Sequence, residues 1–292
     1  MKLVNYLPSF LLKHKVISFL CKTRLQTRIQ EIYFNIDSKI FIDLMDPEPR
    51  NVFITKRFVK HFFEIANNFI TTKSTIFDIG SNVGFCTFGL VSKNPLSSYY
   101  LFEANHQLIY LISKSINLQS STSIHAINAC VTNKRGLTNF HISKNQSGQS
   151  HIAVGNEQST QIENVVLDEF CLNSGINRVE FAKVDLEGNE LPALRGWEKY
   201  LLKQKVDALF VEVIPENQAR YNFSTFELLH YMESLGYDLY LCKNDDFGKF
   251  GEIPKIITCK NGSLTVASFK ANDYPKFFST DILAISNKYL KH

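Results

Sequence analysis

The sequence has little that would place it in a membrane. An apolar stretch near the N-terminus, residues 7–20, is interrupted by Pro8, Lys13, His14 and Lys15, and no small-residue cleavage site follows it. It is too short and too charged for a transmembrane helix, and it does not have the form of a signal peptide. Two interpretations remain for it. One is a basic amphipathic helix on a membrane surface; the other, which we favour, is a helix docked on the domain or on a partner subunit.

Paired cysteines and a basic block are also missing. The six cysteines, at positions 21, 86, 130, 171, 242 and 259, include no CxxC pair and no zinc-finger spacing. They are typical of reduced thiols, so we predict a cytoplasmic protein. The net charge of +4 is dispersed along the chain, which gives no reason to expect a nucleic-acid partner. The 292 residues, 45% hydrophobic and 21% charged, indicate one large globular domain or one domain with appendages.

Two common nucleotide-binding patterns are absent from the most informative segment, residues 75–85. There an apolar run ends at Asp78, and a turn containing Gly80 and Gly84 follows. The dinucleotide pattern G-x-G-x-x-G would need glycine where the chain has Asn82 and Phe85, and no P-loop Gly-Lys-Ser/Thr follows. A strand, a glycine turn and a helix N-terminus still form a nucleotide-like site. We therefore expect a ligand without a pyrophosphate, and an NAD-dependent enzyme acting on a sugar nucleotide is disfavoured.

The pattern after residue 75 alternates between strand and helix. Strands are predicted at 75–79, 98–102, 124–129, 180–185 and 207–213, and helices at 84–93, 106–117, 189–202 and 224–235. Alternation of this kind indicates an α/β fold with a doubly wound, mostly parallel sheet. Residues 1–70 are predicted to be an N-terminal extension with a basic helix, a hairpin, an interruption of regular secondary structure at 46–49 and a helix over 53–70. Residues 71–292 form the main domain, with a small β insertion over 136–168, in which residues 143–150 are a candidate lid.

An acidic residue stands at the end of the second sheet strand, in the segment Leu-Phe-Glu-Ala-Asn. This residue, Glu103, lies 23 residues after Gly80, as expected for one strand–helix–strand unit of about 20 to 30 residues. A carboxylate there is placed to accept hydrogen bonds from two ribose hydroxyls. Together with the helix N-terminus near Gly84, which would face a carboxylate, this indicates S-adenosylmethionine as the cofactor.

Four segments, in order, resemble the motifs of FkbM-type methyltransferases. They are Phe-Asp-Ile-Gly-Ser-Asn-Val-Gly-Phe (77–85), Leu-Phe-Glu-Ala-Asn (101–105), Val-Val-Leu-Asp-Glu-Phe (165–170) and Lys-Val-Asp-Leu-Glu-Gly-Asn-Glu (183–190). The resemblance implies a Rossmann-like class I fold and methyl transfer to an oxygen, often of a sugar or polyketide. It departs at Ala104-Asn105, where Pro-Asn is usual, and at Thr132-Asn133, where a Ser/Gly-Asp pair often lies near the adenine.

The candidate site residues fall into two groups. The cofactor-binding residues are Asp78, Gly80, Asn82, Gly84, Glu103 and Asn105. Asp185 ends a predicted strand and Glu187 follows it. Strand C-termini form the ligand crevice of such sheets, so we assign both residues to catalysis on the acceptor side. His151, after the candidate lid, is a further catalytic candidate. Glu212, an acid inside an apolar strand, is expected near the acceptor.

These assignments predict an O-methyltransferase that uses S-adenosylmethionine to methylate a hydroxyl of a small molecule or glycan. The saccharide acceptor rests on the family resemblance alone. No metal site is assigned, although carboxylates of this kind can hold a divalent cation. Peripheral membrane contact through the N-terminal helix and a homo-oligomer are both compatible with the sequence. The alternative is a binding or scaffold module that keeps the fold without turnover.

Overall fold

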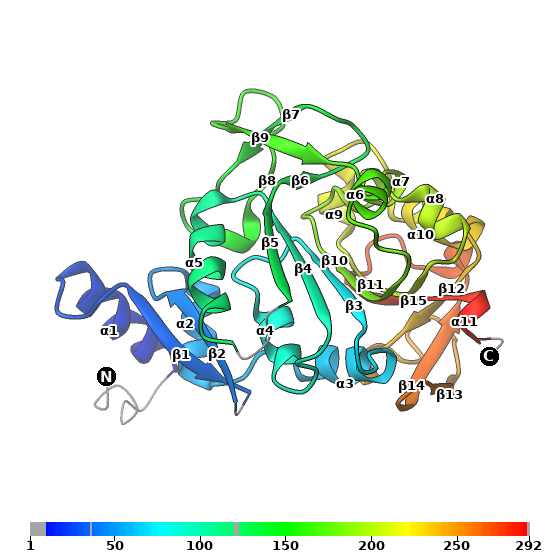
Figure 1. The fold of residues 1–292 in the computed structure, drawn as a ribbon, viewed down its shortest axis with the longest axis horizontal. Helices are drawn as coiled ribbons and strands as arrows, with labels where there is room; N and C mark the ends of the chain where they lie inside the picture. The colour runs from blue at the N-terminus through cyan, green and yellow to red at the C-terminus, as the bar shows by residue number, and fades with distance from the viewer. Residues whose placement is uncertain (1–9, 36, 120–122, 291–292) are drawn as a thin grey trace.

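The centre of the molecule is a nine-stranded sheet with helices on both faces, as the computed structural model shows (Figure 1). The structure describes residues 10–35, 37–119 and 123–290. The strand order is β13-β14-β12-β15-β11-β10-β3-β4-β5. The strands of this sheet are β3 (Thr75–Ile79), β4 (Ser98–Glu103), β5 (Ile124–Asn128), β10 (Val179–Val184), β11 (Val206–Val213), β12 (Tyr237–Leu241), β13 (Pro254–Cys259), β14 (Gly262–Phe269) and β15 (Thr280–Ser286).

The five strands from β11 to β5 pair in parallel, and β15 enters between β11 and β12 antiparallel to both. The parallel part confirms the predicted doubly wound α/β sheet. The helices are α3 (Lys60–Phe69), α4 (Phe85–Val91), α5 (His106–Ile116), α6 (Leu167–Asn173), α7 (Glu190–Arg195), α8 (Glu198–Leu202), α9 (Pro215–Ala219), α10 (Thr225–Ser234) and α11 (Asn287–Leu290). None of the helices in the described ranges has both the length and the apolar character needed to cross a bilayer.

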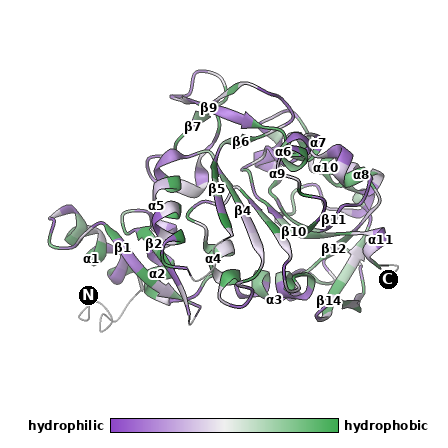
Figure 2. Ribbon diagram, in the orientation of Figure 1, coloured by the Kyte–Doolittle hydropathy of each residue, from purple (hydrophilic) through white to green (hydrophobic). Residues whose placement is uncertain are grey.

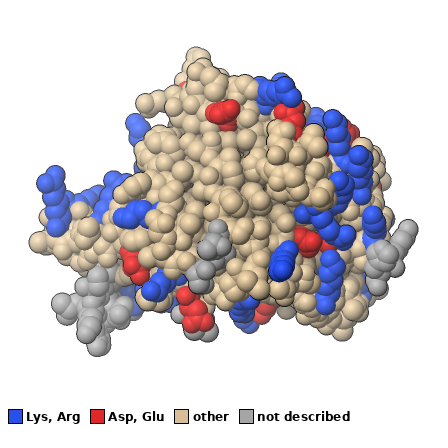
Figure 3. Space-filling view, in the orientation of Figure 1, with Lys and Arg blue, Asp and Glu red and all other residues tan. Residues whose placement is uncertain are grey.

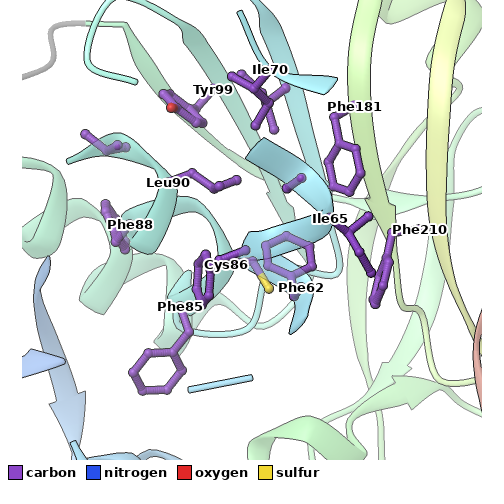
Figure 4. Close-up of a cluster of buried hydrophobic side chains, with 14 of the residues drawn as sticks. Phe62, Ile65, Ile70, Phe85, Cys86, Phe88, Leu90, Tyr99, Phe181 and Phe210 are labelled. Carbon is purple, nitrogen blue, oxygen red and sulfur yellow. The ribbon is translucent and has the colours of Figure 1, made fainter. Parts of the chain in front are cut away.

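Alternating side chains of the central strands contribute to two apolar cores, one on each face of the sheet. On β10, Phe181 belongs to the core under α3 and α4, whereas Ala182 and Val184 belong to the core under α7 and α10. Figure 4 shows the first core, where Phe62 of α3 packs edge-to-face on Phe181 and Phe210. Figure 2 shows hydrophobic residues, in green, along parts of these central strands. The helices cover both faces of the parallel sheet. The edge formed by the carboxyl ends of its strands is therefore where a ligand can bind.

The N-terminal extension packs onto this sheet through a shared core. It consists of α1 (Phe10–Lys22), the hairpin of β1 (Ile29–Phe34) and β2 (Ser38–Asp43), and α2 (Pro47–Thr55). Ile17 of α1 and Ile40 of β2 are fully buried, and Phe34 of β1 contacts Phe85 of α4 edge-to-face. The hairpin forms as the sequence predicts. The extension protrudes from the body at the left of Figure 1.

The insertion forms a separate four-stranded sheet, ordered β6-β9-β7-β8. Its strands are β6 (Cys130–Val131), β7 (Leu137–His141), β8 (His151–Ile152) and β9 (Thr160–Val165). A short 3-10 turn, η2 (Ser147–Gln149), lies in the loop that joins β7 to β8. This loop is the segment that the sequence suggests as a lid.

Three local predictions are wrong. Residues 46–49, where the sequence predicts an interruption of secondary structure, are instead the start of α2. The Asp46 side chain caps the helix, and Pro47 occupies its first turn. The helix expected over 53–70 is therefore two helices, α2 and α3. The helix expected over 189–202 is interrupted at Trp197, which is fully buried and stacks on Phe77 at 5.2 Å.

A fourth difference is the β13–β14 hairpin at the edge of the sheet, which the sequence analysis missed. Its outer strand β13 is mostly exposed. It therefore lacks the clean alternation of buried and exposed residues by which such a strand is recognised.

Candidate active site

A cavity of about 270 Å³ lies where the carboxyl ends of β3, β4, β10 and β11 meet. Its wall contains the glycine turn after β3, Glu103 at the end of β4, Asp185 after β10 and Glu212 near the end of β11. The loop of the insertion and helix α2 complete the wall. The crevice is at the position where open α/β sheets bind their ligands.

The glycine turn is shaped by a close approach between two loops. Gly80 has a φ of +77°, and a Cβ at this residue would lie 1.8 Å from the carbonyl oxygen of Asp185. Asn82 adopts the left-handed conformation, with a φ of +52°, which asparagine tolerates better than most residues. Gly80 and Asn82 line the cavity. Gly84, with a φ of +87°, is the N-cap residue of α4, and a Cβ there would lie 2.6 Å from the ring of Phe88.

Replacing Gly80 by alanine should lower the free energy of unfolding by about 3–5 kcal/mol, because a side chain there combines an unfavourable φ with displacement of the Asp185 loop. The matched control is Gly248→Ala. Gly248 has a φ of +78°, and a Cβ at this residue would meet no atom of the described residues within 4 Å, so this variant should cost only about 1–2 kcal/mol. Urea unfolding of both variants measures the difference. Equal losses would show that the contact with Asp185 is unimportant.

Glu103 holds the turn from the neighbouring strand. Its Oε2 accepts the backbone N–H of Asn82 at 2.8 Å, and its Oε1 accepts that of Asn105 at 2.7 Å. Burial raises the pKa of Glu103 to about 7, against the effect of these two hydrogen bonds. Each carboxylate oxygen can accept a second hydrogen bond. Asn105 does not line the cavity; its side chain caps α5 by accepting from the N–H of Gln107.

Asp78 lies behind the turn and outside the cavity wall. It is 2% exposed, and its Oδ2 accepts from both the N–H and the hydroxyl of Thr87 in the first turns of α4. Burial raises its pKa. The structure therefore places Asp78 where it fixes the start of α4 relative to β3. Of the predicted cofactor-binding residues, Gly80, Asn82 and Glu103 line the cavity, whereas Asp78, Gly84 and Asn105 do not.

Three carboxylates gather on the other side of the cavity. Ligand oxygens of Asp185, Glu187 and Glu212 lie within 4.8 Å of one another. Oδ2 of Asp185 accepts from Lys183 Nζ at 2.8 Å, and the same ammonium donates to the carbonyl of Gly80. Such a cluster suits several hydroxyl donors, and its oxygen ligands also suit a hard divalent cation.

Glu187 is held in an unusual backbone conformation beside this cluster. Its φ of +53° is rare for a residue with a long side chain. Oε2 of Glu187 accepts from Asn217 at 2.8 Å, and Arg220 donates to its carbonyl. The next residue, Gly188, could not carry a Cβ, which would lie 2.2 Å from the carbonyl oxygen of Asn217. Helix α9 thus fixes the turn that aims Glu187 at the cavity.

Crowding keeps protons on several of these acids. Burial, then Asp185 nearby, raises the pKa of Glu187 to about 8 and that of Glu212 to about 10. Burial opposes the charge on Lys183, but Asp185 and neighbouring acids outweigh it and keep the lysine pKa above its usual range. Lys183 therefore carries its charge at neutral pH, where Glu187 and Glu212 are mostly protonated.

Sequence reasoning missed a further acid in this wall, Glu48 of α2. Burial and the proximity of Asp185 and Asp46 raise its pKa to about 7. Its Oε2 accepts from Asn82 Nδ2 at 3.4 Å. Glu48 was not recognised from the sequence because the proline-flanked segment around it is typical of an irregular connection between secondary-structure elements.

The loop of the insertion closes over this edge of the cavity. The N–H of Ser147 donates to Asp46 at 3.1 Å, and its hydroxyl donates to Asn82 Oδ1 at 3.0 Å. Ser147 and Gly148 line the cavity. The loop, the N-terminal extension and the glycine turn are thus joined through Asn82.

The structure does not bring His151 into the cavity wall. Its Nδ1 lies 2.8 Å from the carbonyl of Gln149, and its Nε2 lies 3.2 Å from a carboxylate oxygen of Glu157. The neighbouring residues Ser150 and Ile152 line the cavity, but His151 does not. The imidazole is placed to support the loop, and the sequence could not show this because neighbours on a short strand point in opposite directions.

Comparison with solved structures gives distant methyltransferases. A precorrin-6y C5,15-methyltransferase from Geobacter metallireducens is 9% identical, with 77% of this chain and 88% of that chain covered and a TM-score of 0.39. An rRNA methylase from Streptococcus thermophilus is 15% identical, with coverages of 71% and 93% and a TM-score of 0.39. TYW2 of M. jannaschii, solved with AdoMet, is 11% identical, with coverages of 89% and 88% and a TM-score of 0.37.

Comparison with curated proteins gives no match to the sequence. A family model does match: the methyltransferase FkbM domain covers residues 78–239, which is more than half of the chain. The matched region runs from the end of β3 to β12 and contains the glycine turn, Glu103 and the Asp185–Glu187 segment. The chain therefore belongs to the FkbM family of methyltransferases, with a Rossmann-like class I fold and S-adenosylmethionine as its cofactor.

Proposed function

We propose that this protein is an O-methyltransferase whose acceptor is a hydroxyl group of a saccharide or glycoconjugate. The observation that carries the proposal is the position of Asp185, Glu187 and Glu212 together on one side of the cavity. Ionised carboxylates only accept hydrogen bonds, and protonated ones can do both. A wall of such groups matches an acceptor that presents several hydroxyls.

The opposite side of the cavity fits the cofactor. Ser81 is 5% exposed and lines the cavity, and its hydroxyl has no hydrogen-bond partner within the described residues. Gly80 leaves the backbone of the turn uncovered, and Glu103 can accept from two ribose hydroxyls. We assign the ribose to Glu103 and the amino-acid part to the turn of Gly80 and Ser81.

The chemistry divides between the two sides. S-adenosylmethionine, when bound, supplies a methyl group on a sulfonium, which is a good leaving group. The protein has to hold the acceptor oxygen in line with that methyl, and such positioning is worth up to roughly 7–11 kcal/mol in favourable cases. Oδ2 of Asp185 is engaged by Lys183. We therefore assign Asp185 Oδ1 to a neighbouring hydroxyl of the acceptor, so that the hydroxyl to be methylated keeps its single proton for a base.

A second carboxyl group is needed to take the hydroxyl proton. Glu187, with a pKa of about 8, is close to the value at which a general base works best near neutral pH. Asn217 engages Oε2 of Glu187, so we assign the proton to Oε1. In this proposal His151 supports the loop and takes no part in proton transfer.

Mass spectrometry with S-adenosylmethionine carrying a deuterated methyl group tests this function. The purified protein is incubated with a panel of saccharides and glycoconjugates, and with amine and RNA acceptors as controls. We expect a gain of one labelled methyl on a saccharide, assigned to oxygen by fragmentation. Methylation of nitrogen or carbon would contradict the proposal. Cofactor binding without transfer to any acceptor would favour the binding-module alternative.

A further inference from the structure

Helix α1 has an exposed face that the rest of the chain does not cover. Ile17 is fully buried against the core, but Leu11 and Phe19 on the opposite side are 72% and 61% exposed. Lys15 and Lys22 are also exposed. The four residues follow the spacing i, i+4, i+8 and i+11, which places them in one stripe along the helix.

The charged residues of the chain segment that carries this stripe all have the same sign. Residues 1–30 contain six lysines and arginines and no aspartate or glutamate. Beyond the helix, Leu25 is 74% exposed and lies between the exposed Arg24 and the exposed Arg28, which pairs with Asp43. Lys15, Lys22 and Arg24 have no acidic partner in the part of the chain that the structure describes. Figure 3 shows lysine and arginine side chains, in blue, on the protruding end of the molecule.

We propose that α1 is a docking surface for an anionic lipid bilayer. Large apolar side chains that alternate with lysines along one stripe can enter the boundary between headgroups and acyl chains while the ammonium groups meet lipid phosphates. Figure 2 shows this mixed hydropathy on α1. Lysine stems also bury their methylenes in such a boundary. The buried face, anchored by Ile17, holds the helix so that the stripe faces away from the domain.

Charge argues against a second copy of this chain as the occupant. A symmetric dimer through this face would bring Lys15, Lys22 and Arg24 of the two copies together, and like charges at a contact oppose association. A nucleic acid would use the basic residues but would gain little from Leu11 and Phe19.

Co-sedimentation of the full chain with vesicles tests the proposal. We expect binding to phosphatidylcholine vesicles that contain phosphatidylserine and weaker binding to phosphatidylcholine alone. Phe19→Ser should reduce the partition coefficient by about tenfold, and Lys15→Glu should reduce it by at least about fivefold. Phe277→Ser is the matched control, since Phe277 is 78% exposed but lies outside this region; it should bind as the wild type does.

Several outcomes would overturn the proposal. They are an absence of vesicle binding, equal binding to neutral and anionic vesicles, and binding that Phe19→Ser leaves unchanged. Sedimentation velocity without lipid gives another: a dimer that Phe19→Ser dissociates would identify a second copy as the occupant. Binding of a duplex RNA that Lys15→Glu abolishes and Phe19→Ser does not would identify a nucleic acid. None of these measurements depends on methyl transfer, so the proposed function can fail without affecting them.

Discussion

Replacing Glu103 by alanine should weaken the binding of S-adenosylmethionine by about 100-fold. Glu103 is buried at 8% exposure and is the acid of the cavity that faces the glycine turn from the neighbouring strand. Each hydrogen bond that a ribose hydroxyl gives to a charged group contributes about 1.5–3 kcal/mol. Isothermal titration calorimetry with S-adenosylhomocysteine measures the loss directly.

A cofactor analogue separates this effect from damage to the turn. Loss of Glu103 also leaves the N–H groups of Asn82 and Asn105 without their acceptor, and this alone could weaken binding. A 2′-deoxy analogue of S-adenosylhomocysteine should bind the wild type more weakly than the parent compound. The deoxy analogue and the parent compound should bind Glu103→Ala with equal affinity, because this variant has no carboxylate to accept a hydrogen bond from the 2′-hydroxyl. An equal penalty in both proteins would contradict the ribose assignment.

The pH dependence of binding gives a second check on Glu103. Burial raises its pKa to about 7 in the free protein, and ribose hydroxyl donors favour the ionised form. Affinity should therefore fall as the pH drops below about 7 and level off above it. Glu103→Gln lacks this titration. At each pH, the ratio of the wild-type affinity to the Glu103→Gln affinity therefore reports the ionisation of Glu103 alone, because protons on the ligand affect both proteins equally.

The sequence was sufficient to predict the central sheet because its strands are buried on both faces. The run Ala-Leu-Phe-Val at residues 208–211, for example, is continuous, apolar and buried, and a helical period follows it. The edge of the sheet was harder to predict. Strand β13 is mostly exposed, and a strand without a buried face carries no alternation to detect. The interruption at Trp197 was also hidden, since it depends on packing against Phe77.

The candidate site was predictable where its residues are close in sequence to strand ends. Gly80 and Glu103 follow predicted strands and Asp185 ends one, and the carboxyl edge of the sheet brings the three residues to one cavity. Glu48 was missed because it comes from an extension whose position over the cavity is a matter of tertiary packing. The same limit applies to the Asn82–Ser147 contact, which joins segments 65 residues apart. Local patterns carry no information on such distant pairs.

Replacing Asp185 by asparagine should lower kcat by about a hundred- to ten-thousand-fold with little change in cofactor affinity. The substitution keeps the shape of the side chain but removes the charge that holds Lys183 and, in our proposal, a hydroxyl of the acceptor. A general base and its orienting partners contribute rate factors of this size. The measurements are kcat with the acceptor found by mass spectrometry, and calorimetry with S-adenosylhomocysteine.

A buried aspartate outside the cavity provides the matched control. Asp207 is 1% exposed and pairs with Arg178 and Lys260. Asp207→Asn should therefore lower the free energy of unfolding, because it weakens a buried ion pair, while the folded fraction keeps its kcat. Asp185→Asn also weakens an ion pair with a largely buried lysine and should lose some stability, but, unlike Asp207→Asn, its folded fraction should lose turnover while keeping its cofactor affinity. If Asp185→Asn lost only stability, the Lys183–Asp185 pair would be structural, and the role of holding the acceptor would have to pass to Glu212.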